Sequence, residues 1–249
     1  MLWWYFPLLF CVGLLVGFIN TIAGSGSFLT LPLLIWTGMP ANMANGTNRI
    51  SILLGSLTGV LSFNRKNYFD LRRALLLAAF AVPGAIAGSM FVINIPDELI
   101  EKIIGYVMLG FAVLTIWKPK AFNRKPVQRP DIKIRWYHCL LFILIGFYGG
   151  FIQAGVGIFM LFALVLSVGY DLVNANSIKL ALTLVFTPFS LAVFIINDQV
   201  DWLPGLVLAA GSILGAWWGA RFAIKKGVAA MKTFLFAVLV LSAVKLIFS

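Results

Sequence analysis

The sequence predicts an all-α polytopic membrane protein with two inverted-topology repeats, each a broken or re-entrant helix pair followed by three transmembrane helices. Three observations support this prediction. First, 61% of the 249 residues are hydrophobic and only 11% are charged, whereas soluble domains carry about a quarter charged residues. Second, the sequence matches itself at one constant shift. Third, the loops that this shift makes equivalent carry opposite charge.

The charge and the cysteines narrow the class of protein further. The net charge is +11, but the basic residues lie in short segments between apolar runs. The positive-inside bias of membrane proteins explains this distribution, so we expect no nucleic acid partner. The opening "MLWWYFPLLF" lacks the basic region of a signal peptide, and we interpret it as a retained first helix. Cys11 and Cys139 lie in apolar segments, as packed thiols rather than a disulfide do.

A self-comparison identifies the duplication. A shift of 131 residues aligns Gly24-Ser-Gly26 with Gly155-Val-Gly157, and it continues without a gap to Gly88 and Gly219. Upstream, Gly17 to Asn20 matches Gly150 to Gln153 after a slip of two residues. Matched glycine, asparagine and aspartate positions at one shift indicate a repeat. We therefore divide the chain into a first repeat (1–117), a basic linker (118–136) and a second, inverted repeat (137–249).

Loop charges predict that the second repeat is upside down. Segment 64–73 has four basic residues and one acidic residue, whereas its equivalent, 197–202, has two acidic residues and none basic. The acidic segment 94–102 corresponds to a basic region around Arg221. Because Lys and Arg favour the cytoplasm, equivalent loops lie on opposite sides of the membrane. The linker 118–136 is the most basic segment and is expected in the cytoplasm.

The elements follow in order from hydropathy and from these loop positions. Residues 28–36 are too short, at 1.5 Å per residue, to cross about 30 Å of hydrocarbon. The pair 3–22 and 28–36 must therefore return to the side from which it enters, although a tilted full span extended through 39–45 is an alternative. This path places both termini outside the cytoplasm. The predicted segments are 3–22, a break at 24–27, 28–36, 46–63, 74–93, 103–117, 137–154, a break at 155–157, 158–168, 178–196, 203–220 and 233–248.

Two long motifs resemble the signature regions of the TauE/SafE sulfite-exporter family. They read "INTIAGSGSFLTLPLLIWTGMPANMANGTNRISILLGS" and "GFYGGFIQAGVGIFMLFALVLSVGYDLVNANSIKL". The resemblance covers nearly the whole chain, and it is strongest to a widespread bacterial branch described as membrane transporters. It implies a location in the bacterial inner membrane and secondary transport that exports sulfite, sulfonates or related organic acids.

Three positions depart from the family's usual pattern. The first break reads GSGS where relatives often have a run of glycines, Gly149 stands where many carry an acidic residue, and Gln153-Ala-Gly155 replaces a Gly/Pro turn. These departures leave the substrate and the coupling mode open.

The breaks have the chemistry of an anion site. Irregular backbone at membrane depth must face protein or a water-filled cavity, and a restarting helix presents free N–H groups to an anion. Asn20, Ser25 and Ser27 add donors in the first break, as Gln153 does in the second. The alternative is that the glycines only allow close helix packing.

A second set of polar residues follows each break, in "ANGTNR" (44–49) and "ANSIKL" (175–180). Arg49 and Lys179 could contact an anion, or they could snorkel to the interface. The asparagines could cap helix starts instead. We expect no catalytic residue, no metal ligand and no cofactor. The predicted substrate-binding residues are Asn20, Gly24, Ser25, Gly26, Ser27, Asn45, Thr47, Asn48, Arg49, Gln153, Gly155, Gly157, Asn176, Ser177 and Lys179.

Missing features also inform the functional prediction. Cation carriers and proton relays usually keep a carboxylate inside the membrane. Here, loops are expected to hold the carboxylates Asp70, Asp97, Glu98, Glu101, Asp198 and Asp201. No enzyme motif is present. We therefore predict a small-anion exporter in a lipid bilayer, in which "GAWWGA" would permit a homodimer. The alternatives are a scaffold or accessory subunit without transport activity, and an importer or ion-coupled permease of the same fold.

Overall fold

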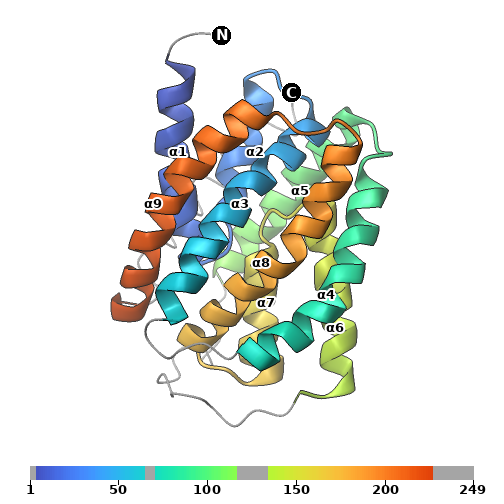
Figure 1. The fold of residues 1–249 in the computed structure, drawn as a ribbon. Coiled ribbons are helices and arrows are strands. Elements are labelled where there is room, and N and C mark those ends of the chain that lie inside the picture. The colour runs from blue at the N-terminus through green and yellow to red at the C-terminus, as the bar shows by residue number, and fades with distance from the viewer. Residues whose placement is uncertain (1–3, 65–70, 117–133, 227–249) are drawn as a thin grey trace.

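The protein is a bundle of helices (Figure 1). The computed structural model describes residues 4–64, 71–116 and 134–226, and these contain no β-strand. Most of the linker 118–136, part of the loop 64–73 and the predicted helix 233–248 lie outside the described residues. The elements are α1 (Tyr5–Ile22), α2 (Ser27–Trp36), α3 (Ala41–Asn64), α4 (Leu71–Val92), α5 (Asp97–Ile116), α6 (Trp136–Phe151), α7 (Val156–Phe162), a π-helix (Ala163–Val168), α8 (Leu172–Ile196) and α9 (Trp202–Lys226).

A break occurs in each half, but each begins earlier than predicted: the breaks are at 23–26 and 152–155, and Ser27 and Gly157 already belong to the following helices. α2 has ten residues and ends at Trp36, so at about 1.5 Å per residue it is too short to cross a membrane. The non-helical turn at 37–40 separates it from α3, so the first segment is not a span extended through 39–45. In the second half, Nε2 of His138 at the start of α6 lies 3.3 Å from the carbonyl oxygen of Ser167. The returning segment 156–168 therefore ends beside the start of α6.

The acidic segment near residue 97 differs from the prediction. Asp97, Glu98 and Glu101 were expected in a loop but lie within α5. Carboxylates in a first helical turn are favourable because they face the positive end of the helix dipole. The carboxylate of Asp97 has a second role, since its Oδ1 accepts a hydrogen bond from the backbone N–H of Asn42 (2.7 Å). It thereby ties the start of α3 to the start of α5.

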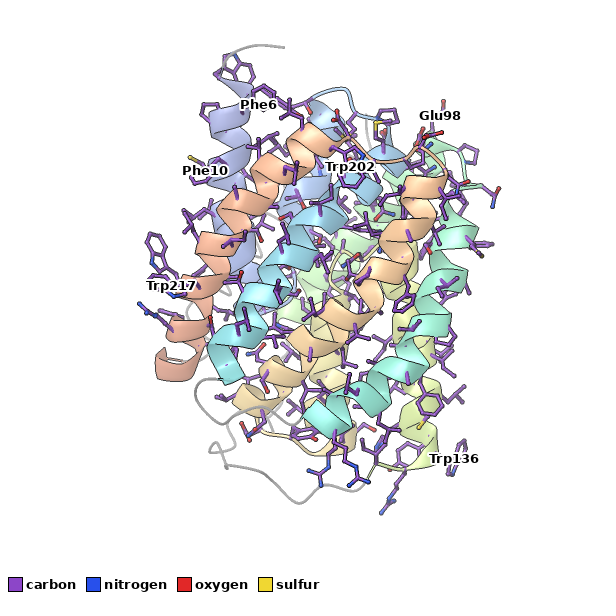
Figure 2. All side chains as sticks on the ribbon, viewed as in Figure 1. Phe6, Phe10, Glu98, Trp136, Trp202 and Trp217 are labelled. Atoms are coloured by element: carbon purple, nitrogen blue, oxygen red, sulfur yellow. The ribbon has the colours of Figure 1, made fainter. Side chains whose placement is uncertain are left out.

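The outside of the bundle is apolar. Four helical segments are long and apolar enough to span a membrane: Tyr5–Ile22, Arg72–Val92, Leu172–Ile196 and Trp202–Ala223. α3 has sufficient length but carries an inward polar face that includes Asn45, Asn48 and Arg49, all fully buried. Trp136 and Trp202 are exposed and lie at opposite ends of the bundle (Figure 2). This placement matches the aromatic belts at the two faces of a bilayer.

Glycines set the closest helix contacts. α1 packs against α9, and α4 packs against α6. A Cβ on any of the contact glycines would collide with the backbone of the facing helix, so the helices meet at backbone distance. The glycines are Gly13 and Gly17 of α1, Gly211 and Gly215 of α9, Gly84 and Gly88 of α4, and Gly146 and Gly150 of α6.

Candidate functional site

The two helix breaks meet inside the bundle. Gly24 has φ +73°, a left-handed conformation that favours glycine, and so does Gly155 with φ +74°. A Cβ on Gly24 would overlap the backbone of Gly157, and a Cβ on Gly157 would overlap Gly24. Gln153 also has positive φ, at +64°, although it is not glycine. The first break, 23–26, therefore touches the first turn of α7, directly after the second break at 152–155, through bare backbone with no side chain between them.

Side chains form hydrogen bonds with several polar groups at the first break and at the start of α2. Oδ1 of Asn20 accepts a hydrogen bond from the backbone N–H of Gly26 (2.7 Å). Asn48 in α3 holds the first turn of α2, because its Nδ2 donates to Ser27 Oγ (3.0 Å) and its Oδ1 accepts from Thr30 Oγ1 (2.6 Å). The N–H group of Gly26 and the hydroxyl of Thr30 are thus engaged within the protein. Nδ2 of Asn20 is buried and has no partner among the described residues.

Lys179 binds the end of α1. Its side chain is 1% exposed, and its ammonium donates to the backbone carbonyls of Asn20 (2.8 Å) and Thr21 (3.2 Å). The third bond goes to Oδ1 of Asn176 (2.8 Å), one turn earlier in α8. The last carbonyls of a helix lack intrahelical partners and carry partial negative charge. Lys179 therefore supplies both donors and a positive charge to the broken end of α1.

Arg49 binds the end of α6. Its guanidinium is fully buried, and it donates to the carbonyls of Gly149 (3.1 Å) and Gly150 (2.6 Å) in the last turn of α6. It also bonds to Gln153 Oε1 (2.6 Å), Ser190 Oγ and Asn45 Oδ1 (3.3 Å). None of these partners is a carboxylate. Arg49 does not snorkel to an interface, and its Nη donors are used inside the protein.

Arg49 and Lys179 each bind a helix end in the other half of the chain. Arg49 belongs to the first half and caps the broken helix of the second, whereas Lys179 belongs to the second half and caps the broken helix of the first. Each cation has an asparagine beside it on its own helix, Asn45 or Asn176. Nδ2 of Asn45 donates to the carbonyl of Phe151 (2.7 Å), which adds a further bond to the end of α6.

A small cavity lies beside the first break. Water-sized space in it amounts to about 20 Å³, which is room for a water molecule and not for a sulfonate. Lys179 lines this cavity and Arg49 does not. The lining residues are Asn20, Gly24, Ser27, Ile52, Ser56, Gln153, Val156, Gly157, Lys179, Leu180 and Thr183.

Two lining hydroxyls were not predicted from the sequence. Thr183 lies one helical turn after Lys179, and Ser56 lies two turns after Asn48. Residues four positions apart share a helix face, so helical periodicity applied to Lys179 and Asn48 would have identified both. At the shift of 131 residues that the predicted repeat uses, Ser56 also aligns with a second hydroxyl residue, Thr187.

Several predicted residues do not line the cavity. Thr47 Oγ1 accepts a hydrogen bond from the backbone N–H of Asp201 (2.8 Å), at the start of α9. Ser177 donates to the carbonyl of Asn174 (2.8 Å). Gly155 lies against Phe28 and Phe111, where a Cβ would not fit. Ser25 is buried, and its hydroxyl has no partner among the described residues.

One buried carboxylate was absent from the sequence-based prediction. Asp171 is 5% exposed and caps α8, because its Oδ1 accepts from the backbone N–H groups of Val173 (2.9 Å) and Asn174 (3.1 Å). An aspartate just before an apolar helix is a typical N-cap. His138 is also buried, and its Nδ1 accepts a hydrogen bond from the Arg135 N–H (3.0 Å).

Comparison with known proteins agrees with the resemblance found in the sequence. The family model for the sulfite exporter TauE/SafE matches residues 9–246. A probable membrane transporter protein of Haemophilus influenzae is 33% identical over 220 residues, covering 88% of this chain and 86% of that protein. The probable membrane transporter protein YfcA of Escherichia coli K12 is 29% identical over 245 residues, covering 96% and 88%. No solved structure matches the chain. The chain therefore belongs to the TauE/SafE sulfite exporter family of membrane transporters.

Proposed function

We propose that this protein is a secondary transporter that exports small anions, sulfite, sulfonates or related organic acids, from the cytoplasm of a bacterium. The substrate binds between the two helix breaks, and the protein works by alternating access. The single observation that carries the proposal is the backbone contact between Gly24 in the first break and Gly157, just after the second break, beside a cavity lined by Lys179. Irregular backbone at membrane depth is expected where it borders a substrate path.

The polar groups around the cavity favour an anion over a cation. Lys179 contributes a positive charge, Asn20 an amide donor, and Ser56 and Thr183 hydroxyls. No carboxylate lines the cavity in the described part of the chain. A cation at this place would meet the ammonium of Lys179 without a negative partner.

Two inverted repeats would provide the alternating access. In support, the bounds of α3 (Ala41–Asn64) shifted by 131 residues nearly coincide with those of α8 (Leu172–Ile196), and α4 corresponds to α9 in the same way. The glycine-lined pairs α1–α9 and α4–α6 are equivalent under this correspondence. In Figure 1, α3 and α8 are drawn in opposite directions, as inverted repeats would be. Rocking of one repeat against the other would open each side in turn.

Polar ties hold one end of the bundle closed. The start of α3 bonds to Asp97 and to the carbonyl of Ile95 (3.0 Å), and Thr47 bonds to the N–H of Asp201. These contacts lie at the end marked by Trp202 and Glu98 in Figure 2. We assign this end to the outside of the cell, because Trp136, which follows the basic linker in the sequence, lies at the opposite end in Figure 2. The structure then corresponds to a state with the exit closed.

The membrane potential suffices as the driving force. An anion that leaves an inside-negative cell gains about 2.3 kcal/mol per unit charge per 100 mV. Export of a monoanion therefore requires no coupling ion. Abolition of efflux by a protonophore at clamped potential would contradict this uniport mechanism.

Counterflow in proteoliposomes tests the proposed function. Vesicles loaded with unlabelled sulfite, methanesulfonate, taurine or acetate are placed in labelled substrate, and uptake is followed with wild type, Lys179→Ala and the surface control Arg221→Ala. We expect accumulation that Lys179→Ala abolishes and Arg221→Ala preserves. Absence of flux for the whole panel, with folded protein, would favour a scaffold. Flux that requires an ion gradient and runs inward would favour an ion-coupled importer.

A further inference from the structure

The donors of Lys179 are fully used in this state. An ammonium group has three N–H donors, and the structure gives that of Lys179 three acceptors, at the carbonyls of Asn20 and Thr21 and at Oδ1 of Asn176. An anion cannot bond to this ammonium unless one of these acceptors is released. The bond to Thr21 is the longest of the three, at 3.2 Å, so it is the first to be released.

An unused donor lies in the same cavity. Oδ1 of Asn20 accepts from Gly26, which fixes the orientation of the amide and leaves Nδ2 without a partner. A buried amide nitrogen without an acceptor is costly, because it loses its bonds to water. Asn20 and Lys179 both line the cavity. Nζ of Lys179 also bonds to the carbonyl of Asn20 itself (2.8 Å), so the two donors come from residues in direct contact.

We infer that Lys179 Nζ and Asn20 Nδ2 form a two-point site for a small oxyanion, and that the anion binds by displacing Lys179 from the end of α1. The inference rests on the proposed function and adds a mechanism to it. The carbonyl that is released lies 158 positions away, in the other half of the chain. Anion binding therefore weakens a bond between the halves, and the substrate itself loosens the closed arrangement. Chloride, with a single atom, cannot bridge the two donors as well as a sulfonate does.

Hydrogen–deuterium exchange of the purified protein in detergent tests this inference. Exchange of the amides in 20–26 is measured with sodium methanesulfonate, with sodium sulfite and with sodium chloride at equal concentration. We expect both oxyanions to accelerate exchange in this segment, and chloride to have little effect. The ligand-free variant Lys179→Met removes the cap outright, so its exchange in 20–26 should be about tenfold faster, as expected for loss of a charge-assisted hydrogen bond.

Two conservative variants separate binding from displacement. Lys179→Arg has five N–H donors and can hold α1 and an anion together, so it should bind methanesulfonate in calorimetry without accelerated exchange. Asn20→Asp keeps the acceptor for Gly26 but replaces the free donor with a carboxylate oxygen. It should lose oxyanion binding, while its ligand-free exchange stays within about twofold of wild type, since aspartate also caps helices.

The outcomes distinguish the inference from the proposed function. If methanesulfonate binds in a Lys179-dependent manner but slows exchange in 20–26, the displacement mechanism is wrong and the anion transporter remains. If Asn20→Asp binds oxyanions as wild type does, the two-point site is wrong. If Lys179→Met binds them as wild type does, Lys179 is not part of the site. If no anion of the transport panel binds to the folded protein, both the inference and the proposed function fail.

Discussion

Gly24 and Gly157 lie in backbone contact, so neither position can hold a Cβ without displacing the other. They come from opposite halves of the chain, and each belongs to a segment where a helix has stopped and another begins. The contact is therefore the place where the two breaks are fixed relative to each other. Four predictions follow from this contact and its surroundings.

Gly24→Ala tests the contact itself. The change adds the strain of a left-handed alanine, roughly 1–2 kcal/mol, and an overlap with Gly157 that costs about 1–3 kcal/mol more. Gly38→Ala is the matched control, because Gly38 has φ +91° with no atom near its Cβ position. We expect thermal unfolding in detergent to show the larger loss for Gly24→Ala. Equal losses would mean that the two breaks do not constrain each other.

Arg49→Lys should destabilise the protein without removing the anion site. A lysine has three donors for the five acceptors that Arg49 serves, so at least two are left without a bond. A loss of about 3 kcal/mol is expected from two charge-assisted bonds. Denaturant unfolding measures it, with the exposed Arg221→Lys as control. Because Arg49 does not line the cavity, calorimetric anion affinity should change less than about twofold, and a large loss would place Arg49 in the site.

Ser56→Ala tests the lining hydroxyls of the cavity. Removal of one neutral hydrogen-bond donor costs about 1 kcal/mol, or roughly a fivefold loss of oxyanion affinity. Ser62→Ala is the control on the same helix, because Ser62 bonds to the carbonyl of Thr58 and does not line the cavity. The measurement is calorimetry with methanesulfonate. Equal affinities in the two variants would exclude Ser56 from the site.

Thr47→Val should open the tied end of the bundle more often. Valine cannot accept the N–H of Asp201, and the lost bond corresponds to as much as about a tenfold change in the opening equilibrium. The readout is labelling of Leu191→Cys, a buried position in α8, by a membrane-impermeant maleimide in a protein without Cys11 and Cys139. Thr47→Ser retains the hydroxyl and should label like the parent. Slower labelling of Thr47→Val would contradict the role of this bond in closure.

The breaks could be predicted from the sequence because their cause is local. Gly24 and Gly155 both have positive φ, which glycine permits. They occupy matching positions in the two halves, so the same local feature occurs twice in the sequence. The family could also be predicted, since its motifs extend through both halves. The start of α5 was predicted too late because its acidic first turn reads as a loop in a hydropathy profile, although a helix dipole favours carboxylates there.

The roles of Arg49 and Lys179 could not be predicted from the sequence. The local sequence indicated that each residue either contacts an anion or snorkels to the membrane interface. In the structure, both residues instead cap helix ends that lie more than 100 positions away. Such a partner depends on the tertiary arrangement that brings Arg49 of α3 to the end of α6 and Lys179 of α8 to the end of α1. The unpaired Nδ2 of Asn20 has the same origin, because it follows from a hydrogen bond across the break to Gly26.

Because Arg49 and Lys179 each bind a helix end in the other half of the chain, unfolding should be cooperative. A chain can unfold one half at a time when each half is stable by itself. Here, loss of the order in either half would leave a buried cation without its acceptors and a helix end without its donors. The described parts of the two halves should therefore melt in a single transition. A protease that cuts only within the linker should leave both fragments associated and protected.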